Sequence, residues 1–516
     1  MNGNGVRIVQ LERDLKGTQV QFDLNNRFFP SLNKFCPSHN LFHVRLISFC
    51  MFRSLIVTTH YEYSLWISFF DFSTRSLQKV KYDSSSLVAH MKGSESFDLQ
   101  SRGVTTKQYV LGRRHEDSSL GLLKVGRYLA IDGSTGSDVY LDCLGPHIVL
   151  ICGKRGYGKS YTMGTLVEEL ALQQRPVSDN IAAVIIDSMG IFWTLANANT
   201  KEEEVLLTWG LKPQALDILT FVPKSSLDRY VDMGIEVKCL TIAASDLSGS
   251  DWCTLFRVSS VHPLGVLITR IIQDLTDGGD SFSLDEMLDR IDSDPYADHD
   301  TKLAARNYLG AARGWGLFEK EGLDIHEIIR PGGTSVIDLS SLSDEGIQSV
   351  IVEIIAKRIY QERIHARRQY EINRMTGSNI TTVPMVWMFV DEAHLFLPQT
   401  GSNPAGDVLV NEWLRQGRQP GLSLVLATQR PSALHPDVLS QSDIIICHRL
   451  TSQDDISALE SIRPTYMHRG IADSIRKMGE GKGVAFIVDD TSEASHVVQM
   501  RPRLSWHGGD EPSAMG

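Results

Sequence analysis

Apolar and polar positions divide the chain into an irregular first part and a long region with a regular strand–helix pattern. Up to about residue 110 the apolar runs are short and show no helical period. From residue 146 onward, buried strand-like runs alternate with helical segments. Such alternation predicts an α/β fold in which a mostly parallel sheet carries helices on both faces.

Five apolar runs in the second region have the length and composition of buried strands. They are HIVLICG (147–153), NIAAVIIDSMG (180–190), GGTSVIDLSSL (332–342), PMVWMFVDEAH (384–394) and GLSLVLATQRPS (421–432). Two segments between them are expected to be helical, namely residues 160–174 and the long stretch 344–368. In the second strand, Asp187 is expected to be the last residue.

The pattern also indicates how the chain is organised into domains. Residues 125–141 read as two strands around a glycine-rich turn, which fits a small β-domain before the alternating region. Residues 262–325 interrupt the alternation with helical segments, so we expect an inserted helical subdomain there. The expected parts are a β-rich N-terminal domain (1–145, with no assignment for 1–110), the α/β core (146–490) and a C-terminal tail (491–516).

The clearest local signal is the stretch GKRGYGKS at residues 153–160. It fits the phosphate-binding pattern G-x-x-x-x-G-K-[ST], with a strand before it and a helix after it, which disfavours a chance glycine-rich turn. Glycines let the backbone N–H groups turn inward, and the helix adds its positive N-terminal end. We expect Lys159 to reach the β- and γ-phosphates of ATP and the Ser160 hydroxyl to bind Mg²⁺. The residues expected around the nucleotide are Gly153, Lys154, Arg155, Gly156, Tyr157, Gly158, Lys159, Ser160 and Tyr161.

An acidic pair follows the apolar strand VWMFV. The strand is expected to deliver Asp391 to the carboxyl edge of the sheet, where its carboxylate can hold Mg²⁺. Glu392 comes next and can polarise the water that attacks the γ-phosphate. A surface acidic pair after a strand is the alternative, but the nucleotide loop in the same chain favours the catalytic interpretation.

The next predicted strand ends in ATQRPS, which places the amide of Gln429 at the same edge. An amide there can contact the γ-phosphate or the attacking water, although a polar strand end is also a sufficient explanation. Three arginines lie close by, Arg415, Arg418 and Arg430, and each could be a solvated side chain. Phosphoryl transfer in ring-shaped motors uses an arginine from a neighbouring subunit, and Arg418 is the first candidate for that role.

The cysteine pattern and the apolar runs bear on the compartment. Seven cysteines are scattered without paired spacing, at positions 36, 50, 143, 152, 239, 253 and 447, so a disulfide framework or a metal site is not indicated. His43, Arg45 and Arg53 interrupt the most apolar early stretch, 41–59, which reads as short strands and not as a membrane span. We expect a cytoplasmic protein without a membrane segment.

Taken together, these motifs resemble the HerA branch of the HerA–FtsK ATPases, from about residue 125 to the end. The resemblance is carried by GKRGYGKS, VIIDSMG, FVDEAH, GRQPGLSLVLATQRPSALHPDVLSQSD and MRPRLSWHGG. It implies a homo-hexameric, ATP-driven DNA translocase with a RecA-like P-loop core, a helical insertion and a small N-terminal β-barrel. It also implies a C-terminal segment that braces the neighbouring subunit, and a nuclease partner, NurA-like or a phage-defence effector.

Two features depart from the family pattern. His147, twelve residues before Lys159, stands where the family often has an arginine that is proposed to act across the subunit interface. The unusually apolar and aromatic stretch 40–70 fits a β-barrel poorly. It is compatible with a divergent barrel, a partner-docking surface or a start upstream of the true domain.

Net charge narrows how such a protein could hold DNA. The chain has 51 basic and 62 acidic residues, a net charge of −11, which disfavours DNA binding by a broad basic surface and favours a few DNA contacts inside a channel.

The sequence leaves two functional hypotheses. The first is a hexameric motor that pumps duplex DNA, coupled to a nuclease. The second is an ATP-dependent assembly or switch protein that regulates a partner without moving DNA, and Glu392 with Gln429 favours the first because both imply turnover.

Overall fold

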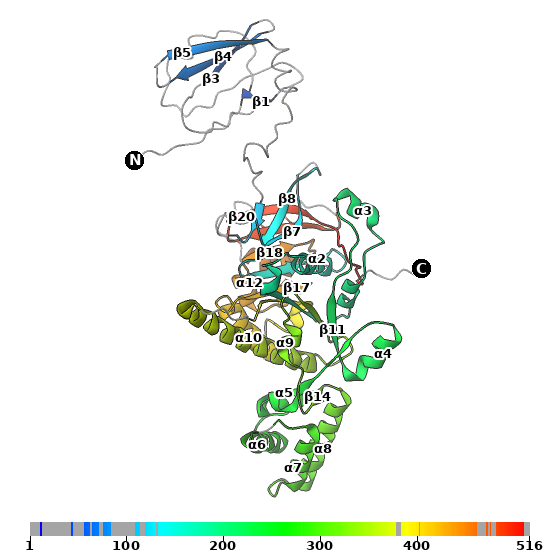
Figure 1. Ribbon diagram of the computed structural model, residues 1–516. Coiled ribbons are helices and arrows are strands. Elements are labelled where there is room, and N and C mark those ends of the chain that lie inside the picture. Colours follow the sequence, from blue (N-terminus) through cyan, green and yellow to red (C-terminus); the bar gives the residue numbers. More distant parts are fainter. Residues whose placement is uncertain are drawn as a thin grey trace. The chain divides into compact units, whose positions relative to one another are not determined.

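The structure is a computed structural model of the 516-residue chain (Figure 1). It describes residues 109–113, 119–130, 133–279, 281–377, 383–401, 403–461, 471–472, 475 and 481–509, together with five strands in the first 106 residues. The chain divides into two compact units, Met1–Thr106 and Lys107–Gly516, and each is described by itself.

In the first unit the described elements are strands. β1 (Leu11–Glu12) and β2 (His43–Val44) form an antiparallel pair. β3 (Ile56–Tyr61), β4 (Ser64–Asp71) and β5 (Ser76–Asp83) form a three-stranded antiparallel sheet. The strand content agrees with the short apolar runs of this part of the sequence.

A thirteen-stranded sheet forms the centre of the second unit. Neighbouring strands from β12 to β18 run parallel, those from β18 to β8 run antiparallel, and β6 pairs parallel with β8. The prediction of an α/β fold with a mostly parallel sheet is therefore confirmed. The strands, in order across the sheet, are β12 (Lys238–Leu240), β11 (Ile218–Pro223), β15 (Thr334–Asp338), β10 (Ile181–Asp187), β16 (Met385–Val390), β17 (Leu422–Thr428), β9 (Ile148–Cys152), β18 (Ile444–Cys447), β19 (Val484–Asp489), β20 (Ala494–Met500), β7 (Leu122–Leu129), β8 (Thr135–Asp142) and β6 (Tyr109–Leu111).

Burial on both faces explains why the central strands are apolar without interruption. Every residue of β10 and of β17 is buried. Successive residues of β10 belong to different halves of the core, with Val184 and Ile186 on one face and Ala183 and Ile185 on the other. A strand covered by helices on both faces reads as a continuous apolar run, which is the pattern that made these strands predictable.

The two strands expected in a small N-terminal β-domain belong to the same sheet. β7 and β8 form the predicted antiparallel pair around a turn that contains Gly133. β7 also pairs with β20, so both strands extend the large sheet beyond β18 and β19. The division of the chain at residue 145 stays a prediction.

Helices cover the sheet and form a separate group beside it (Figure 1). In that group α5, α6, α7 and α8 pack on one another around buried Trp252, and α7 begins with a capping box formed by Ser283 and Glu286. The short parallel strands β13 (Ile242–Ala243) and β14 (Phe318–Glu319) bracket it. The helices are α2 (Lys159–Ala171), α3 (Glu203–Thr208), α4 (Leu227–Asp232), α5 (Gly249–Leu255), α6 (Pro263–Asp277), α7 (Leu284–Ser293), α8 (His299–Gly314), α9 (Ile325–Ile328), α10 (Glu345–Thr376), α11 (Pro404–Val408), α12 (Pro436–Gln441) and α13 (Gln453–Ser461). Among the described residues, no helix combines the length and apolar character needed to cross a membrane.

His147, at the family's arginine position, is a buried part of the sheet. Its Nδ1 lies 2.7 Å from Asp443 Oδ2, and its Nε2 lies 3.7 Å from Asp142 Oδ2. Burial lowers the pKa of His147, but the two carboxylates outweigh burial and raise it to about 9. The imidazolium therefore joins the start of β9 to Asp443, which precedes β18, and to Asp142, the last residue of β8, and both partners are within its own subunit.

The stability of the second unit should therefore depend on the protonation of His147. Because the folded-state pKa is raised from about 6.5 to about 9, the stabilisation is fully present below pH 6.5 and is lost as the pH rises through 9. In denaturant unfolding, the free energy of unfolding of the wild type should fall by up to about 3 kcal/mol over that pH range. The His147→Gln variant should not show this fall. Parallel pH profiles for the two chains would contradict this.

Candidate nucleotide-binding site

The glycine-rich loop connects β9 to α2 at the carboxyl edge of the sheet. Two of its glycines are required by the structure. Gly158 precedes α2 with φ of +109°, a conformation that strains any residue with a side chain. A Cβ atom on Gly153 would lie 2.6 Å from Cβ of His448, so the backbone approaches that residue more closely than a side chain allows.

His448 packs against the loop at Gly153 and was not predicted from the sequence. It is fully buried directly after β18, and its Nδ1 lies 3.0 Å from the carbonyl oxygen of Val484. Since that oxygen can only accept, Nδ1 carries the proton and Nε2 accepts from the Thr162 hydroxyl at 2.9 Å. Burial lowers the pKa of His448 to about 4, so the ring stays neutral at physiological pH and fixes the first turn of α2.

Lys159 is the first residue of α2 and is 5% exposed. Burial lowers its pKa, and the carboxylates of Glu392 and Asp391 act in the opposite direction. The structure thus brings together the lysine and the acidic pair that the sequence placed more than 230 residues apart. A buried ammonium group at the N-terminus of a helix is suited to bind a polyphosphate.

Ser160 and Asp391 lie side by side. The Ser160 Oγ atom is 3.5 Å from Asp391 Oδ2, because β16 ends at Val390 and delivers the aspartate to the loop. Burial, and then the charge of Glu392, raises the pKa of Asp391 to about 6. A hydroxyl and a carboxylate oxygen are the hard ligands that Mg²⁺ prefers, so these residues fit the expected metal.

Glu392 has a strained backbone and an incompletely paired carboxylate. Its φ of +48° lies in the left-handed region, where a non-glycine residue costs on the order of 1–3 kcal/mol. Gln429 Nε2 donates to Glu392 Oε1, so the predicted sensor and the predicted base are in direct contact. The buried Oε2 atom has no hydrogen-bond partner among the described residues, and Nδ1 of His394 lies 3.5 Å from it.

Two more carboxylates crowd the same edge. Asp187 ends β10 and pairs in register with Asp338, the last residue of β15. Burial, and then the charge of Asp338, raises the pKa of Asp187 to about 8, although it accepts from the backbone N–H groups of three following residues. The hydroxyl of Tyr230, a residue of α4, donates to Asp338. Of these two aspartates, the sequence placed only Asp187 at a strand end. The structure shows that Asp338 lies beside it, because β10 and β15 are neighbours in the sheet.

The three candidate arginines have different surroundings. Arg415 is paired with Asp437 at 2.7 Å. Arg418 is exposed, and within the described part of the chain its side chain makes no hydrogen bond or ion pair. Arg430 is also exposed, beside the site. Arg418 and Arg430 thus both have exposed side chains, and the role of Arg418 across a subunit interface stays a prediction.

A phosphate-binding loop, an acidic pair and a polar strand end, gathered at one edge of a mostly parallel sheet, define a P-loop NTPase core. Residues 123–359 match the family model described as the central domain of helicase HerA. The matched segment supports a HerA-type P-loop ATPase, in agreement with the resemblance found in the sequence.

Individual proteins are similar over shorter segments. The DNA double-strand break repair helicase HerA of Pyrococcus furiosus is 29% identical over 177 residues, or 30% of this chain and 31% of the relative. A probable helicase of the same description from Methanocaldococcus jannaschii is 26% identical over 37% of this chain and 41% of the relative. This chain thus spans about a third to two fifths of those relatives. The solved structure of VirB4 of Thermoanaerobacter pseudethanolicus is 12% identical, with a TM-score of 0.43, over 74% of this chain and 97% of that one.

Proposed function

We propose that this protein is an ATP-hydrolysing DNA translocase or helicase that assembles as a homo-hexamer and works with a nuclease. The observation that carries the hydrolysis is the meeting of Lys159 and Ser160 with the acidic pair and Gln429 at one sheet edge. DNA as the substrate is supported by the relatives, which are described as DNA repair helicases. The hexamer and the nuclease are supported by the family resemblance.

Each residue has a distinct part in the proposed hydrolysis. Lys159 places a positive charge on the β- and γ-phosphates. Ser160 and Asp391 would hold Mg²⁺, which neutralises phosphate charge when it is bound. Glu392 orients and polarises the attacking water, and Gln429 contacts the γ-phosphate. Because Gln429 now holds Glu392, engagement of the amide by the γ-phosphate would free the carboxylate for the water.

DNA contacts are proposed for a central channel and not for the basic stretch of α10. There, Arg363 is buried and donates to the carbonyl oxygen of Pro420 at 2.8 Å, and Arg358 pairs with Asp246 at 3.3 Å. Arg367 pairs with Glu371 on the same helix. These partners satisfy much of the positive charge of the helix, and the acidic net charge of the whole chain favours few phosphate contacts.

Two substitutions test the chemistry. Lys159→Ala should abolish ATP turnover by removing the charge at the β- and γ-phosphates. Glu392→Gln should still bind ATP and hydrolyse it at least about 10²-fold more slowly, because an amide cannot take up the proton of water. Phosphate release and nucleotide binding measure both effects, with Glu204→Gln on exposed α3 as the control. Turnover by Glu392→Gln at the control's rate would show that another group activates the water.

A mixing experiment tests the ring. Arg418→Ala should bind nucleotide nearly as the wild type does and hydrolyse it slowly, since an arginine supplied by a neighbour stabilises charge in the transition state. Mixtures of Arg418→Ala with Glu392→Gln subunits should regain activity, because some interfaces then pair an intact arginine with an intact glutamate. Mixtures as inactive as either parent would place Arg418 within its own active site or outside the chemistry.

The length of duplex DNA separates a motor from a switch. At equal concentrations of base pairs, long duplexes of random sequence should stimulate ATP turnover more than short ones, because a translocating ring stays engaged for longer before it reaches an end. Little sequence preference is expected from contacts to the backbone alone. A switch needs only one binding event, so equal stimulation by both lengths, or none, would favour an ATP-dependent assembly or switch protein.

A further inference from the structure

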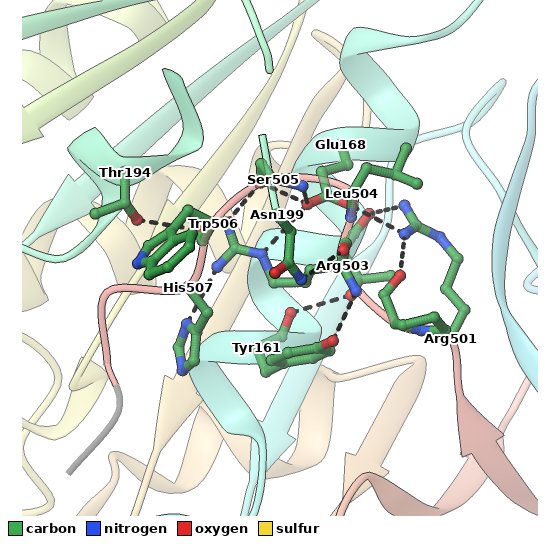
Figure 2. Close-up of polar contacts among 12 residues, drawn as sticks. Tyr161, Glu168, Thr194, Asn199, Arg501, Arg503, Leu504, Ser505, Trp506 and His507 are labelled. Atoms are coloured by element: carbon green, nitrogen blue, oxygen red, sulfur yellow. Dashed lines mark hydrogen bonds and ion pairs between the residues drawn. The ribbon is translucent and has the colours of Figure 1, made fainter. Parts of the chain in front are cut away.

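Residues 501–507, close to the end of the described chain, lie along α2, the helix that follows the nucleotide loop (Figure 2). Its anchor is Glu168, which is 0% exposed and accepts from Arg501 Nη1 at 2.8 Å and from Arg503 Nε at 3.3 Å. The backbone N–H groups of Leu504 and Ser505 also donate to this carboxylate, each at 2.9 Å. Removing one partner from such a buried, charged group is strongly destabilising, so this end of the contact is firmly held.

The other end of the segment reaches Tyr161, the residue after Ser160. The Tyr161 hydroxyl accepts from the backbone N–H of Arg503 at 2.7 Å and donates to Glu202 Oε2 at 2.8 Å. Asn199 completes a ring of hydrogen bonds with Tyr161, Glu202 and Arg503. Its Nδ2 donates to Glu202 Oε2 at 2.8 Å and to the carbonyl oxygen of Arg503 at 3.0 Å. His507 adds an edge contact to the tyrosine ring, with 5.4 Å between ring centroids. Figure 2 shows these side chains converging on the tyrosine.

The guanidinium of Arg503 fits against the helix between these two ends. A Cβ atom on Gly164 would lie 2.6 Å from Arg503 Cζ, so only glycine leaves room for it. The segment therefore follows the helix surface from Glu168 back to Tyr161 through contacts within one subunit. The tyrosine end is partly exposed and is held by neutral hydrogen-bonding groups and one carboxylate, which makes it the end that can open.

We propose that residues 501–507 position the nucleotide loop of their own subunit and that Tyr161 is the positioning residue that connects the two. The inference rests on the proposed function only in that the loop must bind ATP. A tyrosine fixed from outside restricts the backbone of Ser160 beside it, so the loop is ordered before the nucleotide arrives. By linkage, nucleotide binding must then stabilise the contact of the C-terminal segment to the same degree.

Tyr161→Phe tests the connection, because it removes the hydroxyl and keeps the ring against His507. MgATP affinity should fall about three- to tenfold, the effect of losing one or two hydrogen bonds of this kind. The matched control is Tyr128→Phe on β7, which loses a partly buried hydroxyl contact to His496 and should leave the affinity unchanged. Asn199→Ala removes the hydrogen bonds to Glu202 and Arg503 without altering the loop, and it should also lower the affinity for MgATP.

Hydrogen exchange gives a readout that a purely structural role would not produce. In the wild type, MgATP should slow exchange of the amides of residues 503–505, and in Tyr161→Phe saturating MgATP should slow them less. Affinity unchanged in Tyr161→Phe, or exchange at these amides indifferent to MgATP in the wild type, overturns the inference alone. If only Tyr161→Phe weakens binding and Asn199→Ala does not, the hydroxyl acts directly on the nucleotide and the inference also fails. A wild-type chain that binds no nucleotide overturns the proposed function and the inference together.

Discussion

Parallel strand pairing at the centre of the sheet is the constraint on which the site depends. Because β9, β10, β15, β16 and β17 run in the same direction, their carboxyl ends meet at one edge. That edge receives Asp187, Asp338, Asp391 and Gln429 together with the glycine-rich loop. The fold thus gathers catalytic groups from the whole chain, and it also concentrates acidic groups where water is scarce.

This concentration of negative charge sets the chemical state of the edge. Burial and mutual repulsion raise the pKa of Asp187 to about 8 and that of Asp391 to about 6, while Lys159 is the nearby buried cation. The raised pKa of Asp187 favours its protonated form, which reduces the repulsion at this edge. Asp391 remains mostly ionised at neutral pH, and a divalent cation beside Ser160 would stabilise that form further. The edge is thus built to favour positive charge close to Asp391 and phosphate close to Lys159.

The parts that the sequence predicted are those in which local pattern and structure agree. β10 ends at Asp187 as expected, because a strand that is buried on both faces has an uninterrupted apolar sequence. The loop was recognisable from the spacing of its glycines. His448 could not be predicted, since its place under Gly153 results from the pairing of β18 with β9, almost 300 residues apart. Glu168 looked like an ordinary polar position of a helix, and its partners Arg501 and Arg503 come more than 330 residues later. The sharing of one sheet by β7, β8 and β20 was hidden for the same reason, because a strand's sequence does not identify its neighbour.

Rigid and movable parts of the site are consequently divided between α2 and the strand ends. α2 is held at Thr162 by His448, which directly follows β18, and at Glu168 by the C-terminal segment. These two attachments, from different parts of the chain, hold the N-terminal turn of α2 in place before the nucleotide binds. Binding then has little entropy cost for ordering this turn, which is what preorganisation means. Glu392 and Gln429, in contrast, are joined by one hydrogen bond, and the glutamate has a strained backbone and a carboxylate oxygen without a hydrogen-bond partner among the described residues. Strain and an unmet hydrogen bond both lower the cost of rearrangement, so a change in the γ-phosphate should be registered first at this pair and not in the loop.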